Sequence, residues 1–138
     1  MAYHGGETVH CDDVPWLPLA PKIGVRILKL DHESGGFSVM IRAEAGGILP
    51  RHSHIESAEI YVLQGQGTHA QTGAYQAGDY ISEPKGALHD ALAFDQETVL
   101  LMICQGPSAF LGDDDSVQHI MDIPMLEHLS AAYAGGAA

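Results

Sequence analysis

The sequence lacks long apolar runs and contains few basic residues. Its longest apolar run, Val99–Cys104, is far shorter than the roughly 20 residues that a membrane-spanning helix requires. Six basic residues stand against eighteen acidic ones, and the formal net charge is −12. A chain of this charge repels a phosphate backbone. We therefore expect neither a membrane nor a nucleic acid as partner.

Cysteines are scarce, and no secretion signal is visible. The N-terminus has no basic start followed by an apolar stretch, so we expect a cytoplasmic protein. The two cysteines, Cys11 and Cys104, are then expected to be reduced and not bridged. Cys104 lies inside an apolar pattern and is predicted to be a small core residue.

What the sequence does contain is a series of short β-rich segments separated by glycines and prolines. With 138 residues and 46% hydrophobic residues, it fits one globular domain over residues 1–138. The segments Ile23–Leu30 and Phe37–Ala43 alternate apolar and polar residues, as half-buried strands do. Further candidate strands are 60–63, 79–82, 88–94 and 98–104. The last is apolar on both faces and should be central in its sheet.

One helix is predicted near the C-terminus, over Pro124–Tyr133. Pro124 can open it, Leu126 and Leu129 recur at helical spacing, and Gly135 follows as a helix terminator. An all-β domain, either a sandwich or a closed barrel, with one short C-terminal helix is therefore the predicted fold class.

The clearest chemical signal is the pair His52 and His54. On a strand, residues two apart point to the same face, so both imidazoles can bind one metal ion. Alone, such a pair is weak evidence, since two surface histidines are the common alternative.

Two longer patterns surround this pair. The first is Gly-x5-His-x-His-x4-Glu, which runs from Gly46 through His52 and His54 to Glu59. The second is Gly-x5-Pro-x-Gly-x2-His, which runs from Gly78 to His89. Together and in this order they resemble the two motifs of the cupin superfamily. The resemblance implies a jelly-roll barrel of two antiparallel sheets, in which His52, His54 and His89 hold one divalent metal. Without a metal, three converging histidines would be costly buried polar groups.

Most metal-binding cupins add a glutamate from the first motif, and here its spacing is ambiguous. Counted back from Gly65, the glutamate position is occupied by Ala58. Counted forward from His54, Glu59 is acceptable. A slip of one residue turns a strand side chain to the other face. We adopt the count from Gly65, which predicts that Glu59 points away and that three histidines hold the metal without a carboxylate. A bulge near the hairpin would reverse this prediction.

The displacement of the first-motif glutamate by one residue, together with Gly-Ala-Leu-His at 86–89, resembles the acetylacetone-cleaving dioxygenases. These are three-histidine non-haem iron cupins that cleave β-diketones with O2. The segment before Ile23–Leu30 resembles the opening of the related dihydroxyacetophenone dioxygenases. The resemblance covers a core of about residues 14–122. It implies Fe(II), with zinc or nickel possible as purified, and carbon–carbon cleavage of a small β-diketone or hydroxy-ketone.

The resemblance also implies a homodimer and a role for Glu83, which would orient a ligating histidine or a bound water. A solvated carboxylate is the alternative for Glu83. The chain departs from the family at Leu49, where an aromatic residue is usual, and at Ala70, where a basic residue is usual. Both positions shape the substrate pocket, so the substrate is left open.

Two other functions fit the same motifs. Cupin domains that resemble this one occur as zinc-binding sensor domains of anti-sigma factors, although no helical partner-binding segment is recognisable here. A metal-dependent isomerase or decarboxylase is the other, because the fold hosts many chemistries. The histidines outside the motifs lack metal spacing and are expected at the surface: His32, His69, His119 and His128.

Overall fold

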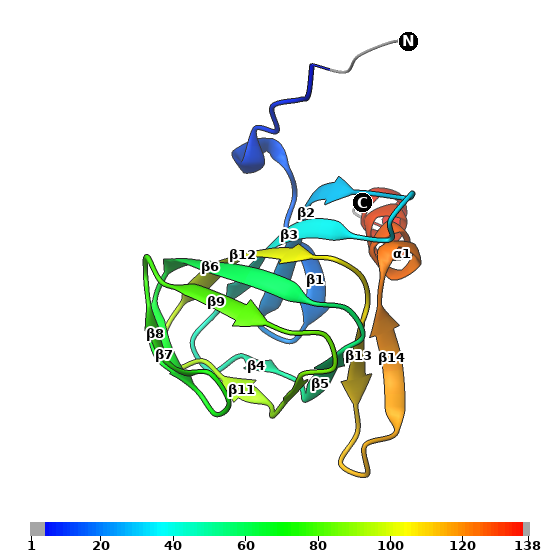
Figure 1. Cartoon of the computed structure of the whole chain (residues 1–138). Helices are drawn as coiled ribbons and strands as arrows, with labels where there is room; N and C mark the ends of the chain where they lie inside the picture. The colour runs from blue at the N-terminus through cyan, green and yellow to red at the C-terminus, as the bar shows by residue number, and fades with distance from the viewer. Residues whose placement is uncertain (1–4, 137–138) are drawn as a thin grey trace.

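Two layers of antiparallel strands face each other in the structure, which is a computed structural model that describes residues 5–136 (Figure 1). The ends of the predicted 1–138 domain, residues 1–4 and 137–138, lie outside this range. After a 3-10 turn at Cys11–Asp13, the first layer is a six-stranded sheet. Its strands, in spatial order, are β1 (Leu17–Ala20), β2 (Ile23–Leu30), β3 (Phe37–Ala43), β12 (Thr98–Cys104), β6 (Ala58–Gln64) and β9 (Tyr80–Glu83).

The second layer is built from shorter strands. Its four-stranded sheet has the order β10 (Leu88–His89), β5 (His52–His54), β13 (Ser108–Leu111) and β14 (Val117–Met121). A two-stranded ladder extends it, formed by β11 (Leu92–Ala93) and β4 (Ile48–Leu49). A separate hairpin, β7 (Gln66–His69) and β8 (Gly73–Gln76), lies at one end of the layers (Figure 1). The predicted cupin jelly roll of two antiparallel sheets is confirmed.

The six-stranded sheet supplies most of the core because its strands alternate regularly. In β3, Phe37, Val39 and Ile41 are buried while the residues between them are only half-buried. Strand β12 lies between β3 and β6, so its predicted central place is confirmed. Its outer face is less covered than predicted, since Ile103 is 40% exposed.

The predicted strand over 88–94 is divided into β10 and β11. The division lies opposite Pro50, between the pairs His89–His52 and Leu92–Leu49. Proline has no amide hydrogen, so it cannot donate to the ladder at this point. The interruption frees Asp90, whose backbone N–H donates to the side chain of Gln71 instead.

The predicted helix is present as α1 (Ile123–Gly136) and is longer than expected. The Asp122 carboxylate accepts the backbone N–H of Met125 and caps the first turn, where Pro124 needs no partner. Leu126 is fully buried, so α1 packs against the sandwich. The helix continues through Gly135, which was expected to end it. Within residues 5–136, no helix has the length and apolarity that crossing a membrane requires.

Candidate metal centre

Three short pieces of backbone bring the motif histidines together. In β5, His52 and His54 are buried and point inward, on either side of the half-buried Ser53. Strand β10 pairs with β5 so that His89 lies directly opposite His52. The predicted convergence of the three histidines is therefore confirmed.

The fourth member of the cluster is Glu83, which comes from the other layer. It ends β9, the edge strand of the six-stranded sheet, and only 2% of its surface is exposed. The alternative of a solvated carboxylate is therefore wrong. One ligand atom from each of His52, His54, Glu83 and His89 lies within 4.8 Å of all the others.

The hydrogen bonds of two histidines leave one nitrogen of each free for a metal. His52 Nδ1 lies 2.9 Å from the carbonyl oxygen of Pro50, which can only accept, so Nδ1 donates and Nε2 carries the lone pair. His54 Nδ1 contacts the hydroxyl of Ser108 at 3.2 Å. Its other nitrogen, Nε2, is turned toward the cluster. Such outer hydrogen bonds are what orient metal-ligating histidines.

Three buried atoms in the cluster have no aligned hydrogen-bond partner: His54 Nε2, Glu83 Oε1 and His89 Nδ1. The Glu83 carboxylate lies between the two rings. Its Oε1 is 3.4 Å from His54 Nε2, and its other oxygen, Oε2, is 2.5 Å from His89 Nδ1. Buried polar atoms without partners are costly, and a bound cation would satisfy all three at once. Imidazole nitrogens with a carboxylate suit iron, zinc or nickel. The four residues can hold one divalent metal.

The charge states of the cluster also suit a cation. Burial lowers the pKa of His52 to about 4, so this ring is neutral at pH 7. Burial by itself would raise the pKa of Glu83, but its contacts with His54 and His89 outweigh this effect and lower the pKa to about 2. The carboxylate is therefore ionised. Histidines that ligate a metal do so as neutral imidazoles, so a divalent ion beside this one carboxylate would leave a single positive charge.

The predicted register of β6 is confirmed. Ala58 is buried, whereas Glu59 is exposed and accepts the hydroxyl hydrogen bond of Tyr80. The strand is less regular than we assumed, because its pairing with β12 shifts by one residue near Leu63. The inward alternation nevertheless holds from Ala58 onward.

Ala58 has a further consequence for the site. It pairs across the sheet with Glu83, and its methyl group leaves the space that a glutamate at this position would fill. The cluster thus has a carboxylate from the neighbouring strand. A shell of three nitrogens, with Glu83 beside it, stays a prediction.

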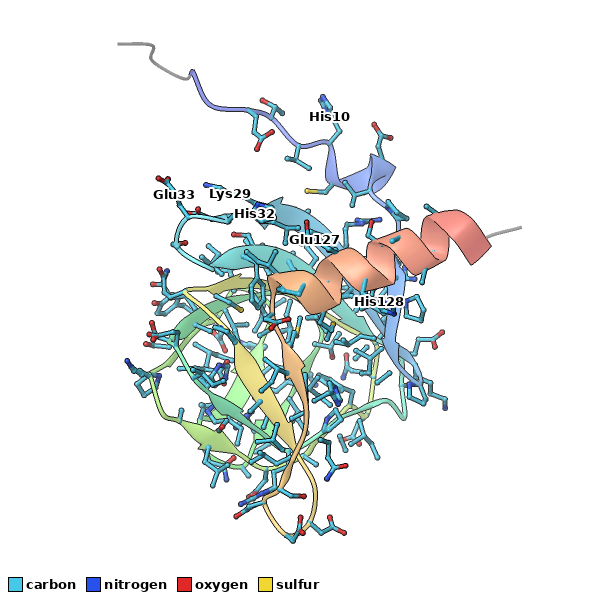
Figure 2. All side chains as sticks on the ribbon, turned by 90° about the vertical axis from the view of Figure 1, so that its right-hand side faces the viewer. His10, Lys29, His32, Glu33, Glu127 and His128 are labelled. Atoms are coloured by element: carbon cyan, nitrogen blue, oxygen red, sulfur yellow. The ribbon has the colours of Figure 1, made fainter. Side chains whose placement is uncertain are left out.

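The four histidines that we predicted at the surface fall into two groups. His32 and His128 lie at the helical end of the molecule (Figure 2), where His32 pairs with Glu127, and both are exposed, as is His119. These predictions are confirmed. His69 is different: only 7% of it is exposed, so its predicted surface position is wrong.

His69, and not Ala70, is the buried residue at this end of β7. We expected Ala70 at the pocket position where the dioxygenase family has a basic residue, but Ala70 is exposed and its neighbour His69 points inward. The ring of His69 lies edge-on to that of His89, with centroids 4.5 Å apart. No periodic apolar pattern marks this segment, because the residues before His69 are Gly67 and Thr68.

A small cavity of about 30 Å³ adjoins the cluster. Its polar lining consists of His52, His69 and Glu83. The other lining residues are aliphatic or aromatic and come from both layers and from the β7–β8 hairpin: Leu49, Ile60, Tyr75, Ile81, Leu92, Leu100 and Met102. Leu49 therefore lies where the sequence placed it, on the pocket wall.

The family comparison matches residues 4–109 to the ChrR cupin-like domain. None of the curated proteins matches the chain. Among solved structures, the acetylacetone dioxygenase from Acinetobacter johnsonii is similar, with a TM-score of 0.82 and 18% identity over 96% of this chain and 94% of that one. A putative acetylacetone dioxygenase from Methylibium petroleiphilum PM1 has a TM-score of 0.83 and 22% identity, over 93% and 96%.

A third similar structure is the complex of Rhodobacter sphaeroides SigE with the anti-sigma factor ChrR. Its TM-score is 0.58 with 23% identity, over 67% of this chain and 49% of that one. At these identities the likeness to solved structures establishes the fold alone.

Proposed function

The chain belongs to the ChrR cupin-like domain family, and we propose that it is a dioxygenase that cleaves a carbon–carbon bond in a small β-diketone or hydroxy-ketone. The proposed cofactor is one Fe(II) ion, held by His52, His54 and His89, with Glu83 beside them. The observation that carries the proposal is the buried four-residue cluster next to an apolar cavity. The fold shared with an acetylacetone dioxygenase supports it.

The charge of the cluster favours a monoanionic substrate. With Glu83 ionised, and with the ligating imidazoles neutral as metal binding requires, a divalent ion leaves one positive charge uncompensated. The enolate of a 1,3-diketone is a monoanion with two oxygen atoms, so it can chelate the ion and neutralise the site. When bound, Fe(II) supplies a Lewis acid for these oxygens and the redox chemistry with O2.

The chain's own residues hold the geometry and exclude water. The hydrogen bonds from His52 to Pro50 and between His54 and Ser108 fix two imidazole rings. Apolar side chains such as Leu100 line the rest of the cavity and keep competing water away.

The proposed reaction is balanced without an external reductant. One β-diketone and one O2 give one carboxylic acid and one 1,2-dicarbonyl compound. The bond between a carbonyl carbon and the central carbon breaks, and one oxygen atom of O2 ends on each fragment. The diketone is oxidised and O2 is reduced.

Oxygen uptake by iron-loaded protein tests the proposal. Protein with one Fe(II) per chain should consume O2 and substrate in a 1:1 ratio with a member of a panel of 1,3-diketones and hydroxy-ketones. Zinc-loaded protein and the His54→Ala variant are the controls, and both should be inactive. If fully iron-loaded protein consumes no O2 with any member of the panel, the proposal is wrong.

A second candidate is a zinc-binding regulatory module. It is favoured by the family match to the ChrR cupin-like domain and by the similar fold in the SigE–ChrR complex. In this case the purified protein should retain one zinc per chain and remain inactive after iron loading. A third outcome of the same assay, substrate conversion without O2 uptake, would indicate the isomerase or decarboxylase alternative.

A further inference from the structure

His69 is a buried histidine that neither cupin motif includes. It is the only buried residue of β7, and it lies beside His89 without belonging to the metal cluster. It shares the lining of the apolar cavity with His52 and Glu83. Its polar ring therefore borders the same cavity as two members of the cluster.

The β7–β8 turn fixes which nitrogen of His69 carries hydrogen. His69 Nδ1 lies 3.1 Å from the backbone N–H of Gln71 and 3.2 Å from that of Thr72, and both groups can only donate. Nδ1 is therefore an acceptor, and the neutral ring carries its hydrogen on Nε2. The hydrogen bonds found among residues 5–136 leave this Nε2–H group without an acceptor.

The turn itself is tied to the metal centre. The Gln71 side chain donates to the Asp90 carboxylate at 2.8 Å and accepts the Asp90 backbone N–H at 3.0 Å. Asp90 follows His89 directly, and it also pairs with Arg51, which precedes His52. The position of His69 is thereby linked to both histidine strands.

We propose that His69 binds the anionic substrate, by donating its Nε2–H hydrogen bond to an oxygen of the anion that the metal holds. The inference rests on the proposed function in one respect, that a chelating anion binds at the cluster. It assigns a substrate-binding group to the hairpin, at the position next to the one expected from the sequence. A donor here favours ligands with a negatively charged oxygen over neutral ones of the same size.

Anion binding by zinc-loaded protein tests this without turnover, because Zn(II) is not redox-active. The probe is acetylacetonate, titrated by calorimetry. We expect His69→Leu to weaken its binding by about 10- to 100-fold, since a hydrogen bond to a charged group is lost. His69→Gln retains an N–H donor and should stay within about threefold of wild type on the same reasoning. His128→Leu, at the exposed helical end, should have no effect (Figure 2).

Two further measurements make the test decisive. All three variants should keep one zinc per chain, whereas zinc loss in His69→Leu would make His69 a metal-site residue and overturn the proposal. Nitrogen NMR of the histidine rings should show the Nε2–H form of His69 and a shift of this signal when acetylacetonate binds. An Nδ1–H form, unchanged affinity in His69→Leu, or no binding by wild type would each overturn it.

The outcome is separable from that of the proposed function. If acetylacetonate binding depends on His69 but iron-loaded protein consumes no O2, the dioxygenase proposal fails and this one stands. If iron-loaded protein consumes O2 and His69→Leu leaves the KM and the zinc-protein affinity unchanged, the dioxygenase proposal stands and this one fails.

Discussion

The two layers of the sandwich divide stability and chemistry between them. Four strands of the six-stranded sheet have seven or eight residues, and the sheet buries residues such as Val39, Ile41 and Val62 almost completely. The facing layer has strands of two to five residues and buries the polar side chains of the histidines. Of the four residues of the metal cluster, only Glu83 comes from the large sheet, at its edge. A regular sheet can therefore act as scaffold while short strands, which are easier to adjust, carry the site.

The largest expected effect is a loss of bound metal, and it tests the role of the layer with the short strands. We expect His54→Ala to retain less than about a tenth of the wild-type metal, because a site of this type cannot hold an ion tightly after losing a ligand. Metal analysis of the purified variant measures this, with His128→Ala as the matched control. Full metal content in His54→Ala would show that the cluster is not the binding site.

The role of the six-stranded sheet in stability is tested by a substitution in its core. We expect Ile41→Ala, at a residue that is 1% exposed, to lower the free energy of unfolding by about 2–5 kcal/mol. Urea denaturation measures the loss, and metal content should remain at one per chain. A loss of metal as large as that in His54→Ala would contradict the division between the layers.

A pH titration of metal-free protein sharpens the comparison further. The pKa of His52 is lowered from 6.5 to about 4 by burial, so between these values the unfolded chain binds more protons. The contribution of His52 to the free energy of unfolding is therefore fully present above pH 6.5. It falls by about 3 kcal/mol in total as the pH decreases toward 4. Denaturation with a chelator present, at pH 7 and at pH 4.5, measures it. The His52→Asn variant should lack this part of the pH dependence, and an unchanged slope would contradict the assignment.

The smallest expected effect concerns Glu59. Because its side chain is exposed on the outer face, Glu59→Gln should leave metal content unchanged and alter the free energy of unfolding by less than about 0.5 kcal/mol. Metal analysis and urea denaturation measure both. Substantial metal loss would mean that Glu59 turns inward in the metal-bound protein.

The sequence was sufficient where a local rule determines the structure. Alternating residues defined β2 and β3, and two fixed spacings identified His52, His54 and His89. The count from Gly65 placed Ala58 and Glu59 on the correct faces, although β6 contains a register shift near Leu63. The count from Gly65 was therefore correct, although the uninterrupted strand on which we based it is not present.

The sequence was insufficient where position depends on contacts between distant segments. The inward turn of His69 follows from a hairpin that pairs only with itself and is held by Gln71 and Asp90. The burial of Glu83 follows from its pairing with Ala58, which lies 25 residues earlier on another strand. Neither relation is visible in a periodic pattern.

The pairing of β5 has a consequence for the order of folding. Its two neighbours, β10 and β13, arrive much later in the chain, and His54 contacts Ser108 across a separation of 54 residues. Closing such long loops costs entropy that only the finished sandwich offsets, so pairings of this kind form slowly. A growing chain contains all four residues of the cluster once His89 has been synthesised, but the Nδ1 partner of His54, the Ser108 hydroxyl, comes only with β13. We therefore expect metal uptake to follow the closure of the sandwich, so that bound metal would mark molecules that have already folded.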